Sequence, residues 1–201
     1  MKIVCLGDSL TYGYGVPRKD TWVSLLNKNG TAAYVNKGIN GDTTGDMLAR
    51  FEQDVLAENP NIVIMMGGAN DFIRGLGLEA VQKNIMAMVE MATGNQIIPV
   101  VGAPFRIKAE TVRADWAAWA DFREVAEKIK LLRNWIIDFS TTSHIEYLDF
   151  YHEFTARTSG EYNSYFRDGL HPNKRGQQII AEIVGEKVDG ILNDHNRKEL
   201  R

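Results

Sequence analysis

The feature that most constrains the fold of this chain is the alternation of short apolar runs with longer stretches of helical period. The apolar runs are bounded by turn residues and predict strands at residues 2–6, 32–36, 61–66, 97–101 and 145–148. The periodicity between and after them predicts helices at residues 21–28, 44–58, 78–93, within 111–139, and at 173–192. This alternation is typical of a parallel sheet with helices on both faces, joined by right-handed crossovers. We therefore predict an α/β fold of three layers (α/β/α), in which a doubly wound, flavodoxin-like parallel sheet has five strands in the order 2-1-3-4-5.

Length and composition favour one globular domain. The chain has 201 residues, of which 44% are hydrophobic and 24% charged, so we expect residues 1–201 to form one domain. Residues 193–201 are polar and charged, and we expect this tail to fray. Apolar runs such as 62–66 are far shorter than the ~18 residues of a membrane span, so no span is expected.

The charge balance and the cysteine count bear on partners and compartment. The chain has 23 Lys and Arg residues and 26 Asp and Glu residues, a net charge of −3, so nucleic acid is not an expected partner. Its one cysteine, Cys5, has no second cysteine with which to pair. Met1 leads directly into an apolar run that is too short for a secretory signal. We therefore expect a cytoplasmic protein; the sequence says nothing of its oligomeric state.

Polar clusters that contain glycine follow three of the predicted strands. They lie at residues 7–10, 38–43 and 67–71, and a fourth cluster, Asp-Gly-Leu-His-Pro-Asn at 168–173, precedes the last helix. Ligands bind to sheets of this kind at the carboxyl ends of the strands, where loops diverge and helices begin. We therefore expect the four clusters to meet at one edge of the sheet.

The residue types in these clusters are those of nucleophilic catalysis. A serine hydroxyl becomes a useful nucleophile when a neutral imidazole accepts its proton and a carboxylate orients that imidazole. Asp168 lies three residues before His171, and a tight turn can bring its carboxylate to Nδ1 and leave Nε2 facing Ser9. We predict a triad of Ser9, His171 and Asp168. The backbone N–H groups of Ser9 and Gly41 and the side-chain amide of Asn70 are the candidate donors to the oxyanion.

Taken together, these motifs resemble the GDSL lipases and esterases, also called SGNH hydrolases. Gly7-Asp8-Ser9-Leu10 matches the block that holds the family's nucleophile, and Gly41 and Asn70 match its oxyanion residues. Asp168 and His171 match its last block, Asp-x-x-His. The resemblance spans residues 3–185. Within the family, the sequence is similar to the bacterial arylesterase and lysophospholipase branch. It implies an SGNH-type fold and the triad and oxyanion roles given above.

We therefore predict a serine esterase or lipase that works through an acyl-enzyme on a small-molecule ester. Its expected substrates are short-chain acyl or aryl esters, with lysophospholipids as further candidates. No cofactor is expected, and no metal either, because His144, His152 and His195 lack the i, i+4 spacing of a zinc helix. The alternatives are a carbohydrate O-acetylesterase on the same scaffold and a non-catalytic binding module. A phosphate-binding flavodoxin-like domain is disfavoured, because residues 10–12 are poor in phosphate donors.

Several of these residues also have structural interpretations. Ser9 could cap a helix that begins near Leu10, and Asn70 could brace its loop by accepting backbone hydrogen bonds. Asp8 and Asp71 are expected to tie down their loops in the same way. One apolar helix face is predicted from spacings of three and four, and it comprises Trp116, Trp119, Phe122, Val125, Ile129, Leu132 and Ile136. We expect this face, Trp119 included, to pack on the sheet, with the alternative that the two tryptophans wall an acyl pocket or act as a lid.

Overall fold

The computed structural model describes residues 1–30, 32–158 and 160–199, and its sheet has the predicted strand order. Five parallel strands in these residues lie in the order β2-β1-β3-β4-β5. Their bounds are Lys2–Gly7 (β1), Ala33–Gly38 (β2), Ile62–Met66 (β3), Ile98–Ala103 (β4) and Glu146–Asp149 (β5). The chain moves outward from β1 in both directions, which confirms the doubly wound α/β fold and places the switch point beside β1.

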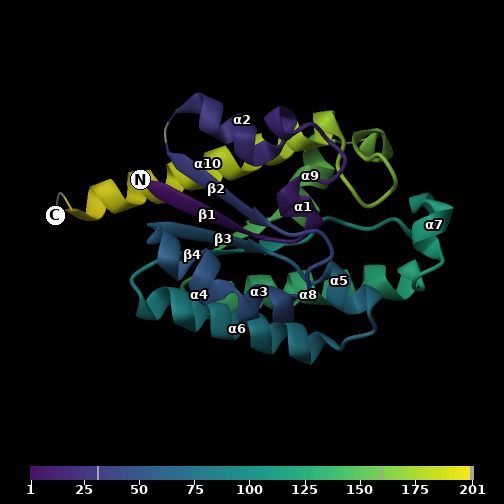
Figure 1. The fold of residues 1–201 in the computed structure, drawn as a ribbon, viewed down its shortest axis with the longest axis horizontal. Coiled ribbons are helices and arrows are strands. Elements are labelled where there is room, and N and C mark those ends of the chain that lie inside the picture. The colour runs from purple at the N-terminus through teal and green to yellow at the C-terminus, as the bar shows by residue number, and fades with distance from the viewer. Residues whose placement is uncertain (31, 159, 200–201) are drawn as a thin grey trace.

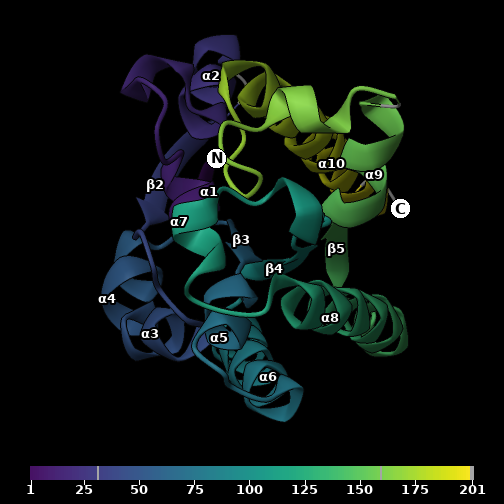
Figure 2. The same ribbon diagram turned by 90° about the vertical axis from the view of Figure 1, so that its right-hand side faces the viewer.

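Helices cover both faces of the sheet (Figure 1). One layer consists of α2 (Trp22–Asn29), α9 (Phe150–Arg157) and α10 (Lys174–Glu199), and the other of α3 (Thr44–Ala49), α4 (Phe51–Asp54), α6 (Leu78–Gly94) and α8 (Phe122–Ser143). Short elements complete the chain: α1 (Ser9–Tyr12), α5 (Ala69–Ile73), α7 (Ala114–Ala117) and the 3-10 turns η1 (Arg18–Asp20), η2 (Leu56–Glu58), η3 (Ala109–Thr111) and η4 (Tyr162–Tyr165). Figure 2 shows α1, α5 and α7 around the edge where the strands end. Within the described residues, no helix is long and apolar enough to cross a membrane.

Two hydrophobic cores lie on opposite faces of the sheet. Successive residues of a strand point to opposite faces, so Ile62 and Ile64 of β3 belong to the core under α2, α9 and α10, and Val63 and Met65 to the other. All four side chains are buried. A strand that is apolar on both faces is typical of a parallel sheet between helical layers. Burial on both faces holds the strand between the two helical layers, and it therefore also fixes the position of the loop that follows the strand.

The prediction of one continuous helix at residues 44–58 is wrong. The backbone leaves helical torsions at Arg50 (φ −105°, ψ 8°), and the segment forms α3, α4 and η2 in succession. Met47, Phe51 and Val55 are nevertheless all buried in the same core. Because their spacing of four is kept across the break, the apolar pattern carries no sign of it.

The predicted helix within residues 111–139 begins later than the apolar pattern suggested. Helix α8 starts at Phe122, where the Asp121 side chain accepts the N–H of Arg123 and caps it. Val125 and the apolar positions that follow it are buried, which confirms the predicted face from Phe122 onward. Trp116 lies on the separate helix α7, and Trp119, between the two helices, is 73% exposed. The prediction that Trp119 packs in the core is therefore wrong.

The C-terminal part contains one helix that the sequence analysis missed and one that it ended too early. Helix α9 is capped by Asp149 and buries Phe150 and Phe154, whose spacing of four was the available signal. Helix α10 continues to Glu199, so residues 193–199, expected to fray, are helical. Residues 200–201 of that tail lie outside the described residues.

Candidate active site

Ser9 is the first residue of α1, and Asp8 separates it from the end of β1. The carboxylate of Asp8 accepts the N–H of Leu10 over 2.9 Å and so caps this helix. The interpretation of Ser9 as the cap is therefore wrong. Its side chain is turned to another partner, because Ser9 Oγ lies 3.0 Å from Nε2 of His171.

Asp168 and His171 form a compact turn that orients the imidazole. Asp168 Oδ2 lies 2.9 Å from Nδ1 of His171, and Oδ1 accepts the backbone N–H groups of Leu170 (3.1 Å) and His171 (2.8 Å). Burial opposes ionisation of Asp168, but the hydrogen bonds from His171 and Leu170 outweigh it and lower the pKa of Asp168 to about 2. The structure thus joins Ser9, His171 and Asp168 in one hydrogen-bonded chain whose last member is an ionised carboxylate.

Gly41 lies beside Ser9 and His171, on the loop between β2 and α3. It has φ +84°, a torsion that glycine adopts without steric cost, and Arg74 donates to its carbonyl over 2.7 Å. Among the hydrogen bonds of the described residues, the backbone N–H groups of Ser9 and Gly41 have no acceptor. Two of the three predicted oxyanion donors are therefore free to bind a ligand.

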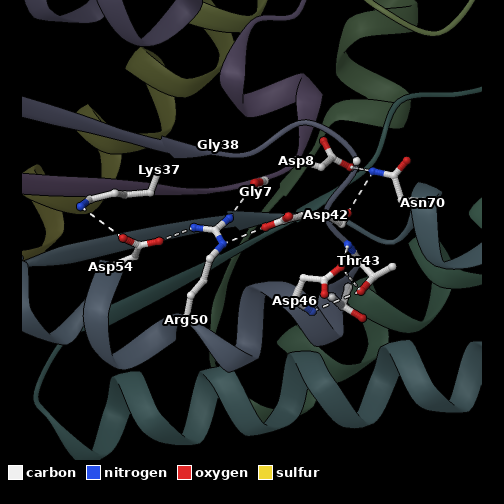
Figure 3. A network of polar contacts seen from close by, with 12 residues as sticks. Gly7, Asp8, Lys37, Gly38, Asp42, Thr43, Asp46, Arg50, Asp54 and Asn70 are labelled. Carbon is white, nitrogen blue, oxygen red and sulfur yellow. Dashed lines mark hydrogen bonds and ion pairs between the residues drawn. The ribbon is translucent and has the colours of Figure 1, made fainter.

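A network around Arg50 holds this loop against the end of β1 (Figure 3). Arg50 donates to Asp42 Oδ2 over 2.8 Å, to the carbonyl of Gly7 over 3.0 Å and to Asp54 Oδ2 over 2.7 Å. The sequence analysis missed this role of Arg50. No local pattern signals it, because Gly7 and Arg50 are 43 positions apart.

Asn70 is the third predicted donor, and its amide is engaged in the structure. Nδ2 donates to the carbonyl of Asp42 over 2.9 Å and to Asp8 Oδ2 over 3.3 Å (Figure 3). Asn70 thus holds the Gly41 loop by donating hydrogen bonds rather than by accepting them. The contact with Asp8 is long, so it is the one that an oxyanion can displace at lower cost.

Two buried aspartates support these loops, as the sequence analysis expected. Asp71 accepts the N–H of Thr44 over 2.9 Å and its hydroxyl over 2.6 Å. Asp8 is buried, and burial raises its pKa to about 7, although the N–H of Leu10 and the charge of His171 act in the opposite direction. Asp8 is therefore an acidic group that changes its charge near neutral pH, one residue from Ser9.

We expect Asp8→Asn to stabilise the protein at pH 8 and to stabilise it less at pH 5. The pKa of Asp8 is about 7 in the folded protein against an ordinary value of 3.8, so the folded state binds more protons between these values. The stability due to the protonated group is lost as the pH rises. Asparagine stays neutral, and its oxygen can accept from Leu10.

Thermal unfolding at the two pH values measures this effect. We expect the melting temperature of Asp8→Asn to exceed that of the wild type by several degrees at pH 8, since ~1 kcal/mol shifts it by roughly 2–4 °C in a chain of this size. The exposed Asp138 provides the control Asp138→Asn, with no such difference. A melting temperature at or below that of the wild type at pH 8 would contradict the assignment.

A pocket of about 220 Å³ opens at the Ser9 and His171 side chains. Trp116 and Trp119 both line it, so the structure places them where the pocket alternative put them. The rest of its wall is largely apolar and includes Leu10, Ile73, Phe105, Ile107, Phe166 and Leu170. Such walls suit an acyl or aryl group. In the described part of the chain, no group of three or more His, Cys, Asp or Glu side chains could hold a metal ion.

Comparisons with known proteins agree with this geometry. Residues 5–179 match the model of the GDSL-like Lipase/Acylhydrolase family. An arylesterase of Vibrio mimicus is 28% identical over 193 residues, covering 93% of this chain and 88% of that protein. Thioesterase 1/protease 1/lysophospholipase L1 of Escherichia coli (strain K12) is 24% identical, covering 95% and 85%. The structure of a protein described as lipolytic, of the G-D-S-L family, from Desulfitobacterium hafniense DCB-2 superposes with a TM-score of 0.77 at 30% identity, covering 92% of this chain and 98% of that one.

Proposed function

Because this chain belongs to the GDSL-like lipase/acylhydrolase family and is thereby a serine ester hydrolase, we propose that it cleaves carboxylic esters through an acyl-enzyme formed on Ser9. One observation carries the proposal. Ser9 Oγ, the two ring nitrogens of His171 and the Asp168 carboxylate form a continuous chain of contacts of 3.0 and 2.9 Å at the mouth of an apolar pocket.

Each member of the chain has a chemical role in this proposal. Ser9 Oγ attacks the ester carbonyl while Nε2 of His171 takes its proton, and the ionised Asp168 stabilises the imidazolium through Nδ1. His171 then gives the proton to the departing alcohol, which leaves the acyl group on Ser9. A water molecule, activated by His171 in turn, releases the acid and restores the serine.

The negative charge of the tetrahedral intermediate needs donors that are already in place. The free N–H groups of Ser9 and Gly41 supply two, and the Asn70 amide supplies a third when it turns from Asp8 Oδ2 to the substrate oxygen. The Asn70 contact with the Asp42 carbonyl can remain, because the amide carries two N–H groups.

We expect Asn70→Ala to lower kcat about 10²–10³-fold, the effect of removing one side-chain donor from an oxyanion hole. A comparison of Asn70→Ala with Asn70→Asp does not separate this role from loop bracing, because the contacts that hold the loop also use the N–H group. The affinity for a boronic acid, which mimics the tetrahedral intermediate, separates them when it is measured together with the melting temperature. The boronic acid affinity should fall in parallel with kcat/KM while KM and the melting temperature stay near their original values; a fall in melting temperature with unchanged kcat would assign Asn70 to the loop alone.

The pocket favours esters with a short acyl or aryl group. Its volume of about 220 Å³ and its aromatic walls suit such groups. The relative named arylesterase supports this substrate class, and the relative named lysophospholipase L1 makes lysophospholipids a further candidate. A panel of p-nitrophenyl esters from acetate to palmitate, with one acetylated xylose ester, tests the proposal. We expect turnover to be highest for the short acyl chains, whereas no hydrolysis of any ester by the folded protein would contradict it.

A cytoplasmic location is part of the same proposal. The single cysteine of the sequence, Cys5, is buried in β1, and a chain with one cysteine forms no internal disulfide that needs an oxidising compartment. Fractionation of cells that express the native gene tests it. We expect ester hydrolysis in the cytoplasmic fraction; recovery from the periplasm or membrane would contradict this location.

A further inference from the structure

Among the described residues, the Asp168 carboxylate receives one hydrogen bond from outside its own turn, and the donor is Trp116. The indole Nε1–H donates to Oδ2 over 3.2 Å. This is the oxygen that lies 2.9 Å from Nδ1 of His171, while Oδ1 accepts two backbone N–H groups. An ionised carboxylate has about four acceptor positions, so Trp116 fills the last of them. The Asp168 side chain has no exposed surface, so in this arrangement water cannot replace that donor.

The Trp116 ring also contacts the imidazole that Asp168 orients. The ring centroids of Trp116 and His171 are 5.5 Å apart, and Tyr14 lies 4.5 Å from the same imidazole. Tyr14 and Trp116 in turn meet edge to face at 6.3 Å. The imidazole thus packs against two aromatic rings, which restrict its rotation away from Ser9.

Backbone contacts hold α7 on the turn that contains Asp168. The N–H of Arg113 donates to the carbonyl of Asp168 over 3.0 Å. Gly169 has φ +83°, and a Cβ at this position would lie 2.2 Å from the carbonyl oxygen of Thr111. The glycine therefore permits a close approach that a side chain would block. These contacts place the Trp116 indole independently of its own hydrogen bond.

We propose that Trp116 is a positioning residue of the triad, a role that rests on the proposed function. Its N–H fixes Oδ2 of Asp168, which keeps Nδ1 of His171 hydrogen-bonded and Nε2 directed at Ser9. Trp116 also lines the pocket, so the effect of the N–H must be separated from that of the ring. Phenylalanine separates them, because it keeps an aromatic ring but has no donor.

Trp116→Phe is expected to lower kcat about 10-fold on a short aryl ester, with KM within about twofold, since small displacements of catalytic groups cost up to ~10²-fold. Trp135→Phe is the matched control. Trp135 stacks on Phe139 of α8 at 4.9 Å and does not line the pocket, so this variant should keep the wild-type kcat. A change in KM alone in Trp116→Phe would make Trp116 a pocket wall and overturn the proposal.

A double-mutant cycle with Asp168→Asn tests whether Trp116 acts through the carboxylate. Residues that act as one unit have non-additive effects, so Trp116→Phe should cause no further loss of kcat in the Asp168→Asn background. The same tenfold loss in both backgrounds would overturn the proposal. Wild type and Ser9→Ala are measured in the same assay. Absence of wild-type turnover, or full activity in Ser9→Ala, would count against the proposed function instead.

Proton NMR gives a readout that does not depend on turnover. The Nδ1–H proton of His171 should exchange faster with water in Trp116→Phe than in the wild type or in Trp135→Phe. The reason is that the Asp168 carboxylate, which accepts the hydrogen bond from this proton, is no longer held by the Trp116 N–H. An unchanged resonance and exchange rate in Trp116→Phe would contradict the positioning role even if the esterase assay gave no signal.

Discussion

Ser9→Ala is expected to lower kcat for a short aryl ester by roughly 10⁴–10⁶-fold, the range seen when a serine hydrolase loses its nucleophile. The remaining donors of the site still bind the substrate, so KM should change much less than kcat. Ser9 is only half-buried, and its hydroxyl contacts His171 rather than the core. The melting temperature should therefore stay within a few degrees of the wild-type value.

Ser143→Ala is the matched control for this experiment. Ser143 is exposed at the last residue of α8 and has no contact with the triad. The kcat of this variant should equal that of the wild type, measured on the same ester with both variants shown to be folded by circular dichroism. If Ser9→Ala kept more than about a tenth of the wild-type kcat, Ser9 would not be the nucleophile.

Asp168→Asn is expected to lower kcat about 10⁴-fold by stabilising the wrong tautomer of His171. The backbone N–H groups of Leu170 and His171 both point at Oδ1, so an asparagine at this position keeps its carbonyl oxygen there. Its NH₂ group then faces Nδ1, which must become an acceptor and lose its proton. Nε2 carries the proton instead and cannot take one from Ser9.

The exposed Asp138 again supplies the control, because Asp138→Asn removes the same charge from a distant helix surface. The kcat of both variants is measured at pH 8, together with their melting temperatures. A loss of less than about 10-fold in folded Asp168→Asn would show that His171 does not depend on this carboxylate, and the triad as described would be wrong.

The sheet and the loops of the site could be predicted because they lie next to strongly patterned segments. Ser9, Gly41 and Asn70 each follow a strand within a few residues, and the ends of parallel strands meet at one edge. A small error in a strand boundary therefore does not move these residues away from each other. Asp168 and His171 were found by their spacing, which one turn accommodates.

The parts that could not be predicted depend on contacts between segments with no regular pattern. The helix break at Arg50 leaves the apolar spacing unchanged, and Arg50 bridges to Gly7 across the fold. Trp116 and Trp119 continue the apolar period of α8 backward, although the helix begins only at Phe122. The hydrogen bond from Trp116 to Asp168 joins residues 52 positions apart, for which no sequence pattern exists.

Labelling with a fluorophosphonate tests the central claim, that Ser9 is the nucleophile of an ester hydrolase, most directly. The reagent forms a covalent bond with a serine that is activated by a neighbouring imidazole. After proteolysis, mass spectrometry should find one adduct, on the peptide that contains Ser9. The remaining esterase activity should fall in proportion to the fraction of protein that is labelled. Asp168→Asn should label far more slowly than the wild type. An active enzyme that is not labelled, or whose adduct lies on a residue other than Ser9, would contradict the claim.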